Sequence, residues 1–393
     1  MAEPALSEDE ALHWLALRMT AGLGARNAGK LIGIFRTPQA IFRASRSELE
    51  AAGLSAALAR SISSGTAFDE AASQHQKLAG SGTMLVPMAS REYPPELREI
   101  YDPPPMLFAR GRVELLQNLI IGVVGTRRPT PYGTQVATRL SRDLAQAGLT
   151  IASGMARGID TAAHKAALEA GGNTIAVFGC GVDQVYPAEN RKLAEQIMEQ
   201  GLAISEFPMG EPAYPQNFPV RNRIISGMSA GVLVVEGGEY SGSAITAKLA
   251  AEQNREIFAV PGNITSKQSW GPNLLIKQGA KLVQEWNDVV SELKTSDRRR
   301  LSDQLRNKLQ IQEMVGPETS RGAGSSLVSG PMGPVVGALL RSLRPDQPVS
   351  LDHLVETLDS CSSSEIIAGL FELEMAGLVR QLPGKSYLKV WAD

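Results

Sequence analysis

Six short apolar runs recur between residues 119 and 263, and amphipathic helical patterns separate them. The runs are Leu119–Gly125, Leu149–Ala152, Thr174–Phe178, Leu202–Ser205, Val232–Val235 and Glu256–Val260. Short apolar strands that alternate with helices predict an α/β fold, an extended Rossmann-like, doubly wound parallel sheet. Ligands of such sheets bind at the carboxyl ends of the strands, so a binding site is expected at that edge.

The 393-residue chain is long enough for two or three domains. Residues 1–82 show helical spacing around two Gly-Leu turns, at Gly22 and Gly53, and predict an N-terminal all-helical domain of the helix-hairpin-helix or SAM-like type. The backbone of such a hairpin can bind a phosphate, but a helical packing module explains the pattern equally well. Residues 83–293 form the predicted Rossmann-like domain, with an edge strand at Thr83–Pro87. Residues 93–108 are rich in proline and predict an extended strap.

Two further segments follow the predicted sheet. Residues 294–333 start with a basic run and continue with Gly, Ser and Pro, which predicts a linker. The basic run either contacts nucleic acid or is a solvated helix tail. Residues 334–393 predict three helices and a hairpin, the arrangement of a winged helix. The third predicted helix, 362–376, carries glutamates and no Lys or Arg, so we expect a protein-contact or regulatory role for this domain.

The bulk composition narrows the function classes. A net charge of −2 gives no overall attraction for nucleic acid, so a polyanion site must be a local patch. The only cysteines, Cys180 and Cys361, are isolated, which is typical of a reducing compartment. No signal peptide and no apolar run of about 18 residues is recognisable, so a cytoplasmic location is expected.

Motifs for common cofactors and for catalysis are missing from the sequence. The turn after the first strand fails the dinucleotide-binding spacing, and no phosphate-binding P-loop sequence occurs. Asp160 and His164 are four residues apart on a predicted helix, a spacing compatible with acid–base chemistry. We expect instead that Asp160 caps this helix and that His164 is structural. No catalytic residue, cofactor or metal is assigned.

Arginines collect at the predicted strand ends. Arg127 and Arg128 follow the first strand, Arg157 follows the second, and Arg221 and Arg223 enter the helix before the fifth. The helix dipole disfavours a cation at a helix start by ~0.3–1 kcal/mol, so this placement indicates a shared anion. A run of phosphates, as in a DNA single strand, would use several arginines at once.

The aromatic residues and glycines at this edge allow two interpretations each. Phe218, Tyr186 and Tyr214 could stack on bases or simply pack the loops. The glycines at strand-to-helix turns either let the backbone approach a ligand or only allow a tight turn.

Five motifs carry a resemblance to a known family. They are Val124–Arg128, Ser153–Asp160, Gly179–Asp183 with Tyr186-Pro187, Phe218–Ile225 and Val260–Asn263. With its helical front and winged-helix tail, the chain resembles the DNA-processing protein A family, called DprA or Smf. The resemblance implies a non-enzymatic protein that binds single-stranded DNA, forms a homodimer through the Rossmann-like domain, and loads RecA during natural transformation. It also implies that Arg127 is the DNA-contacting arginine of the Gly-x-Arg turn.

Combining the strand-end pattern with the resemblance gives one set of candidate DNA- and phosphate-binding residues. They are Gly125, Thr126, Arg127, Arg128, Ser153, Gly154, Arg157, Gly158, Arg191, Phe218, Arg221, Asn222, Arg223, Ser243 and Lys248.

The turn Glu236-Gly237-Gly238 keeps an enzymatic alternative open. It faintly resembles the Pro-Gly-Gly-x-Gly-Thr turn of nucleoside-monophosphate phosphoribohydrolases, but Val235 precedes it and Ser241-Gly242-Ser243 replaces the Gly-Thr pair. A third hypothesis is a scaffold that acts through its two end domains.

Overall fold

A computed structural model of the chain describes residues 6–239, 241–299, 301, 333–343, 349–358, 366, 369–370, 373, 379–382 and 386–389. The chain folds into two compact units, Met1–Lys308 and Leu309–Asp393. Among the described residues, no helix is both long and apolar enough to cross a membrane.

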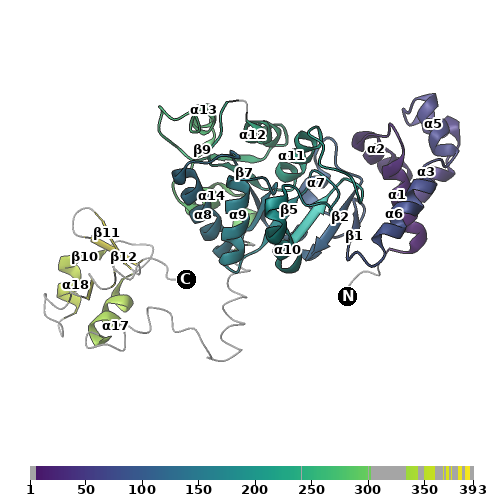
Figure 1. Cartoon of the computed structure of the whole chain (residues 1–393). Coiled ribbons are helices and arrows are strands. Elements are labelled where there is room, and N and C mark those ends of the chain that lie inside the picture. The colour runs from purple at the N-terminus through teal and green to yellow at the C-terminus, as the bar shows by residue number, and fades with distance from the viewer. Residues whose placement is uncertain are drawn as a thin grey trace. The chain divides into compact units, whose positions relative to one another are not determined.

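The described residues before 82 are helical, as predicted (Figure 1). The helices are α1 (Glu8–Met19), α2 (Ala25–Phe35), α3 (Pro38–Arg43), α4 (Arg46–Ala51), α5 (Ala56–Ser63) and α6 (Phe68–Leu78). Ser7, Thr37, Ser45 and Ser55 start α1, α3, α4 and α5 by accepting a backbone N–H with the side chain. The middle of α1 is buried among the other helices, which makes it the centre of this segment.

A nine-stranded sheet forms the middle of the chain. Its strands are β1 (Met84–Pro87), β2 (Met106–Gly111), β3 (Ile120–Val124), β4 (Thr150–Ser153), β5 (Thr174–Val177), β6 (Leu202–Ser205), β7 (Gly231–Val234), β8 (Glu256–Ala259) and β9 (Lys281–Leu282). Their order is β1-β2-β6-β5-β4-β3-β7-β8-β9. Neighbours from β6 to β9 pair parallel, whereas β1 and β2 are antiparallel additions at one edge. The six predicted strands and the predicted edge strand are confirmed, with ends that differ by at most one residue.

The prediction of an extended strap over residues 93–108 is wrong at 95–98, where a helix forms, and right at 106–108, which are extended in β2. Pro95 instead occupies the first turn of α7 (Pro95–Arg98), where the missing N–H of proline has no cost. After three prolines the chain enters β2, which joins β1 to β6. Its side chains Met106 and Phe108 are fully buried in the core shared with the N-terminal helices.

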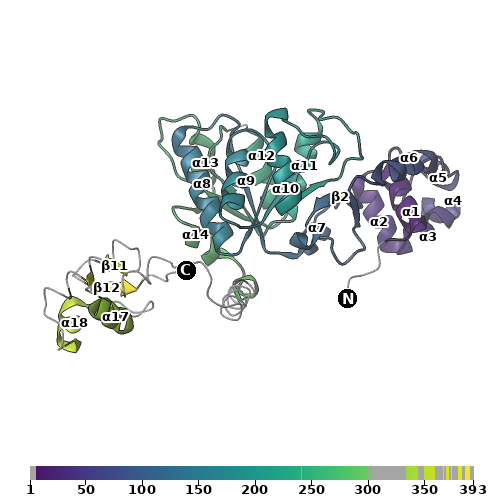
Figure 2. The ribbon, with the colours of Figure 1, turned by 60° about the horizontal axis from the view of Figure 1, so that its bottom comes forward.

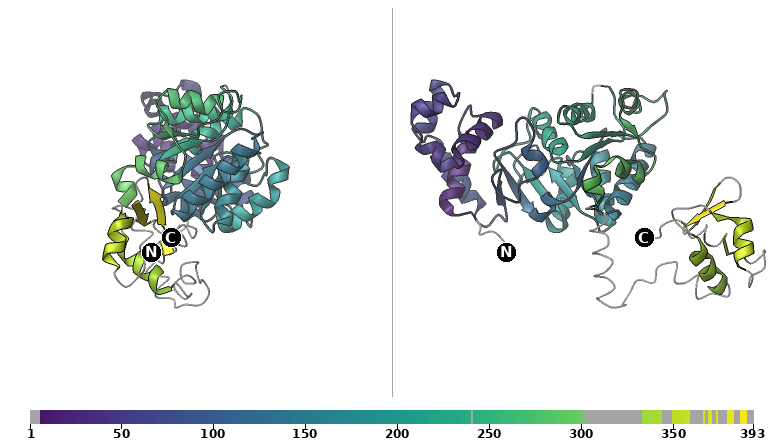
Figure 3. Two further views of the ribbon diagram at one scale, coloured as in Figure 1. Left: turned by 90° about the vertical axis from the view of Figure 1, so that its left-hand side faces the viewer. Right: turned by 180° about the vertical axis from the view of Figure 1, so that it is seen from behind.

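Helices cover both faces of the sheet (Figures 2 and 3). One face carries α8 (Pro131–Gln146), α9 (Ile159–Glu169), α10 (Arg191–Gln200) and α14 (Trp286–Glu292). The other carries α7, α11 (Asn217–Gly227) and α12 (Gly242–Glu252), while α13 (Trp270–Lys277) packs near β8. Two 3-10 helices, Val113–Gln117 and Ala188–Asn190, lie in loops. Alternate side chains of each strand enter the two cores, which explains the continuous apolar runs in the sequence.

The second unit contains the predicted hairpin. Its elements are α17 (Gly333–Ser342), β10 (Val349–Ser350), α18 (Leu351–Thr357), β11 (Val379–Leu382) and β12 (Ser386–Lys389), with strand order β10-β12-β11. Ser350 caps α18 by accepting the His353 N–H, as predicted. Most of the third predicted helix lies outside the described residues. So do residues 302–332, which make up most of the predicted linker. Within that helix, Ile366, Leu370 and Leu373 are described and are buried in the core of this unit.

Candidate nucleic-acid interface

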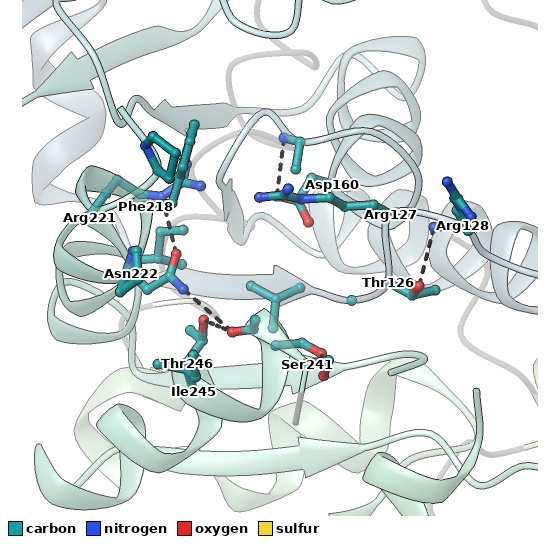
Figure 4. A pocket seen from close by; sticks show the side chains of 18 of the residues that line it. Thr126, Arg127, Arg128, Asp160, Phe218, Arg221, Asn222, Ser241, Ile245 and Thr246 are labelled. Carbon is teal, nitrogen blue, oxygen red and sulfur yellow. Dashed lines mark hydrogen bonds between the residues drawn. The ribbon is translucent and has the colours of Figure 1, made fainter. Parts of the chain in front are cut away.

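A pocket of about 640 Å³ opens at the carboxyl ends of β3 and β7 (Figure 4). These strands are neighbours in the sheet, although the chain leaves β3 toward β4 on one side and reaches β7 on the other side much later. Such a switch point is where open α/β sheets bind ligands. Most of the pocket lining comes from the loop after β3, from α11 and from the start of α12.

The loop after β3 has a fixed backbone and free side chains. The Thr126 N–H donates to the Glu236 carbonyl at 2.7 Å, and the Thr126 hydroxyl accepts the Arg128 N–H at 3.2 Å. Gln268 donates to the Arg128 carbonyl at 3.2 Å. Both Arg127 and Arg128 are exposed, and neither guanidinium forms an ion pair with a described carboxylate. Two cations are therefore held at the pocket mouth and available to an anion.

Glu236 is bound to the start of α8 and does not line the pocket. Its carboxylate is buried and accepts the Thr130 hydroxyl at 2.6 Å and the Thr130 N–H at 2.9 Å. An acidic group at a helix N-terminus is favoured by the helix dipole. This engagement gives Glu236 a structural role, so the site does not favour the phosphoribohydrolase alternative.

Phe218 is surrounded by two guanidinium groups and a second ring. The Cζ atoms of Arg127 and Arg221 lie 5.6 Å and 5.9 Å from its ring centroid. The Tyr186 ring lies 5.5 Å away, tilted by 40°. Figure 4 shows Arg127 reaching from the end of β3 toward the side of the pocket formed by α11. Cations over a ring face are attracted by its quadrupole, so this arrangement orders Arg127 without neutralising it.

Arg221 lines the pocket, but its guanidinium is already committed to the protein. The side chain is buried, and its Nη1 donates to the carbonyls of Gly154 and Val177. Burial lowers the pKa of Arg221 to about 10, opposed by the nearby Asp160 carboxylate, so the group stays charged at neutral pH. Arg221 therefore ties the carboxyl ends of β4 and β5 to α11, which the sequence pattern did not indicate.

Asp160 and His164 both have structural surroundings. Asp160 accepts the N–H groups of Gly154 at 3.1 Å and Ala156 at 3.3 Å. It thus holds the loop before α9, and the expectation that it caps the helix is wrong, because the cap position is Gly158. Burial raises the pKa of Asp160 and lowers that of His164 to about 3. The structural role expected for His164 agrees with this buried, neutral imidazole.

The structure brings together only part of the candidate set. The residues that line the pocket are Gly125, Thr126, Arg127, Arg128, Phe218, Arg221, Asn222 and Ser243. Gly154 and Arg157 line a smaller hollow beside it, which also contacts Arg127, Tyr186 and Phe218. The remaining candidates line neither: Ser153, Gly158, Arg191, Arg223 and Lys248.

Ser153 and Gly158 support the loops of the site. Ser153 is fully buried and donates its hydroxyl to the Val123 carbonyl at 2.6 Å, so it links β4 to β3. Gly158 has a φ of 80°, and a side chain there would collide with the Thr126 carbonyl. Both residues position the loops, and neither lines the pocket.

Several of the expected cations are paired with acids. Arg223 is buried and binds Glu206 at 2.6 Å and Asp102 at 3.0 Å. It is two residues from Arg221 on α11, and such residues point to different sides of a helix, so both could not face the pocket. Arg157 pairs with Glu189 at 2.5 Å. Lys248 lies 3.9 Å from its helical neighbour Glu252 and is exposed, as is Arg191 at the start of α10.

The sequence pattern missed part of the lining. The missed residues include Ala213, Pro215, Ser241, Ile245, Thr246 and Gln268. Ser241 caps α12 directly after the loop that follows β7, a signal that its position could have provided. Gln268 has no such signal, because its loop reaches the pocket through a long-range bond from the Gly237 N–H to the Gln268 carbonyl at 2.7 Å.

Fold and site together define a Rossmann-like protein with free arginines and an aromatic ring at the switch point of its sheet. Residues 84–294 match the sequence model of DNA recombination-mediator protein A, and residues 334–385 match that of the DprA winged helix domain. The chain belongs to the DprA/Smf family of DNA processing proteins.

Relatives with known names support this assignment. DNA processing protein DprA of Bacillus subtilis is 46% identical over 213 residues, which cover 54% of this chain and 72% of the relative. Protein Smf of a Synechocystis strain is 37% identical and covers 75% of this chain and 77% of its own length. The X-ray structure of DprA from Streptococcus pneumoniae superimposes with a TM-score of 0.64 at 33% identity, covering 74% of this chain and 99% of that one.

Proposed function

We propose that this chain binds single-stranded DNA in the switch-point pocket and passes it to the RecA recombinase during transformation or recombination. The observation that carries the proposal is the Arg127 guanidinium, exposed, free of described acidic partners and 5.6 Å from the Phe218 ring. Membership in the family of recombination-mediator proteins supports a DNA ligand.

The chemistry of the lining suits a strand with unpaired bases. Guanidinium groups bind phosphate, and an aromatic ring can stack on a base only where that base is not already stacked in a duplex. Arg127, Arg128 and the partly buried Phe218 offer both kinds of contact in one pocket. These contacts do not read base edges, so binding is expected to tolerate any sequence.

The opposite wall offers a second phosphate position. Ser241 and Ser243 lie at the start of α12, their hydroxyl oxygens 2.8 Å apart. Free N–H groups at a helix start favour an anion. A strand across the pocket would thus contact the guanidinium groups after β3 on one side and the start of α12 on the other.

The first prediction tests Arg127 directly. Arg127→Ala should weaken binding of a fluorescent oligonucleotide about tenfold and reduce the salt slope by about 0.7, the value for one phosphate of a single strand. Phe218→Ala should weaken binding to a similar degree with an unchanged salt slope, because stacking releases no counterion. The measurement is fluorescence anisotropy at several salt concentrations.

Arg139→Ala provides the matched control, because Arg139 is an exposed arginine of α8 that does not line the pocket. Its affinity and slope should equal those of the unchanged chain. Wild-type affinity in both Arg127→Ala and Phe218→Ala would show that DNA does not bind in this pocket.

Transfer to RecA and a homodimer through the Rossmann-like domain are further parts of the proposal, and the family resemblance supports them. Sedimentation should give twice the monomer mass. Oligonucleotide held by this chain should form RecA filaments faster than the same oligonucleotide coated with a single-strand-binding protein alone. A monomer, or filament growth unaffected by this chain, would contradict the corresponding part.

A further inference from the structure

The loop between β6 and α11, residues 206–216, forms one wall of the pocket and also contacts the N-terminal helices. Ala213 and Pro215 of this loop line the pocket, and Phe218 follows within three residues. No described residue before 124 lines the pocket, so the helices have no direct access to a ligand there. Their contact with the loop is therefore an indirect connection to the site.

Two polar side chains of the helical segment hold the loop by its backbone. Arg18 of α1 donates from Nε to the Glu206 carbonyl at 3.0 Å. Gln74 of α6 is 5% exposed and donates from Nε2 to the Met209 carbonyl at 3.2 Å. Each bond comes from a residue more than 130 positions away in the sequence, so neither is a local turn.

The same loop is continuous with the core of the helical segment. Met209 is 6% exposed and belongs to the cluster that contains Leu15 of α1 and Ala71 of α6. The pocket-lining Ala213 packs against this cluster. A displacement of α1 or α6 would therefore be transmitted to the pocket wall through close-packed side chains.

The sheet side of the loop is fixed as well. Asp183 accepts the Gly210 N–H at 2.9 Å, and the Gly181 N–H donates to the Glu211 carbonyl at 2.9 Å. Residues 206–211 are thus clamped between two layers, whereas 212–216 depend on this anchor and on α11 for their position. Removing the helical half of the clamp would loosen the wall next to Phe218.

We propose that Arg18 and Gln74 are positioning residues for the DNA pocket, which makes the N-terminal helical segment a support for the pocket wall. The inference rests on the proposed function for its DNA readout. It assigns to this segment a role without DNA contact, in contrast to phosphate binding by its hairpins.

The test uses the full chain with the double substitution Arg18→Ala and Gln74→Ala. Amide hydrogen exchange should accelerate in residues 206–216 and remain unchanged in β3 and β4. The dissociation constant for a labelled single strand should rise about tenfold, within the usual range of coupling between sites. The salt slope should stay at its original value, because no phosphate contact is removed. Arg60→Ala, an exposed arginine of α5, is the matched control and should change neither readout.

Each outcome decides a different point. Unchanged exchange in 206–216 would overturn the inference, whatever happens to DNA binding. A salt slope that falls with affinity would also overturn it, because Arg18 would then contact the strand. If the double variant loses protection throughout α1–α6, Gln74→Ala alone replaces it, because that change deletes a single hydrogen bond. Should Arg127→Ala leave binding intact, the proposed function fails, while the exchange result still tests the clamp.

Discussion

Three arginines near the pocket have three different environments. Arg127 is exposed beside a ring, Arg221 is buried and donates to backbone carbonyls, and Arg223 is buried between carboxylates. Sequence spacing located all three near strand or helix ends. It could not distinguish their roles, because the direction of a side chain depends on the helix it lies on and on partners far away in the chain.

Gly154 is predicted to be intolerant of any side chain. A Cβ there would lie 2.5 Å from the Arg221 guanidinium carbon, so Gly154→Ala must displace a buried cation. We expect a loss of stability of about 1–3 kcal/mol, the usual cost of overpacking, together with weaker DNA binding. Urea unfolding followed by circular dichroism measures the first effect.

Gly33→Ala is the matched control for this prediction. Gly33 is exposed within α2, and a Cβ there would meet no atom within 4 Å. This change should leave stability equal or raise it by up to about 1 kcal/mol, because alanine favours the helix. Equal effects of the two substitutions would contradict the packing argument.

His164 should make stability depend on pH. Burial lowers its pKa to about 3, so the folded chain keeps the imidazole neutral while the unfolded chain protonates below the ordinary value of about 6.5. The contribution of His164 to the free energy of unfolding is therefore complete above pH 6.5. It is lost as the pH falls toward 3, by about 1.4 kcal/mol per pH unit.

The comparison of wild type with His164→Gln isolates the contribution of His164 to the pH dependence of stability. The buried carboxyls of Asp160 and Glu206 have raised pKa values and contribute slopes of the opposite sign in both proteins. Urea unfolding at pH 7.5, 6 and 5 should show wild type losing more stability than His164→Gln. Parallel pH profiles would indicate that the folded imidazole accepts a proton.

At the scale of elements, α11 serves the pocket and the core at once. Phe218, Arg221 and Asn222 line the pocket, Ile224 packs on the sheet, and Ile225 does both. The apolar runs predicted the strands because a parallel sheet buries both of its faces. The sequence did not predict β2 as a strand, because prolines directly precede its apolar run. Its antiparallel pairing also depends on β6, which lies about 95 residues later in the chain.

The ion cluster around Arg223 of α11 gives a prediction at this scale. Arg223→Met leaves the buried Glu206 without its ion-pair partner and should cost about 3–5 kcal/mol, measured by urea unfolding. Adding Glu206→Leu should recover much of that loss, since an apolar pair of similar size needs no desolvation of charge. The salt slope of DNA binding should not change in the double variant. A reduced slope would mean that Arg223 contacts phosphate after all.

At the scale of the whole molecule, the two compact units should unfold independently. Leu354 is fully buried in the second unit, so Leu354→Ala should destabilise that unit by about 2–5 kcal/mol. Calorimetry should show one transition shifted and the other unmoved, and single-strand affinity should be retained. A common shift of both transitions would show that the units are energetically coupled.

The sequence predicted the kinds of domain better than the contacts among them. Helical spacing indicated the N-terminal helices, but nothing in α1 or α6 indicated that Arg18 and Gln74 bind the β6–α11 loop. Long-range hydrogen bonds to backbone carbonyls leave no periodic signal, because any residue supplies the acceptor. The pocket edge was likewise predicted from strand ends, and Ser243 was among the predicted residues. The lining residues Ile245, Thr246 and Gln268 became visible only in three dimensions.

The adjacency of β3 and β7 also bears on protein synthesis. The ribosome makes β3 about 110 residues before β7, and the loop with Gln268 comes later still. A nascent chain that has exposed only its first 230 residues therefore carries Arg127 without the opposite rim of its cavity. Under the proposed function, a strand can span both rims only after translation has supplied residues 241–268.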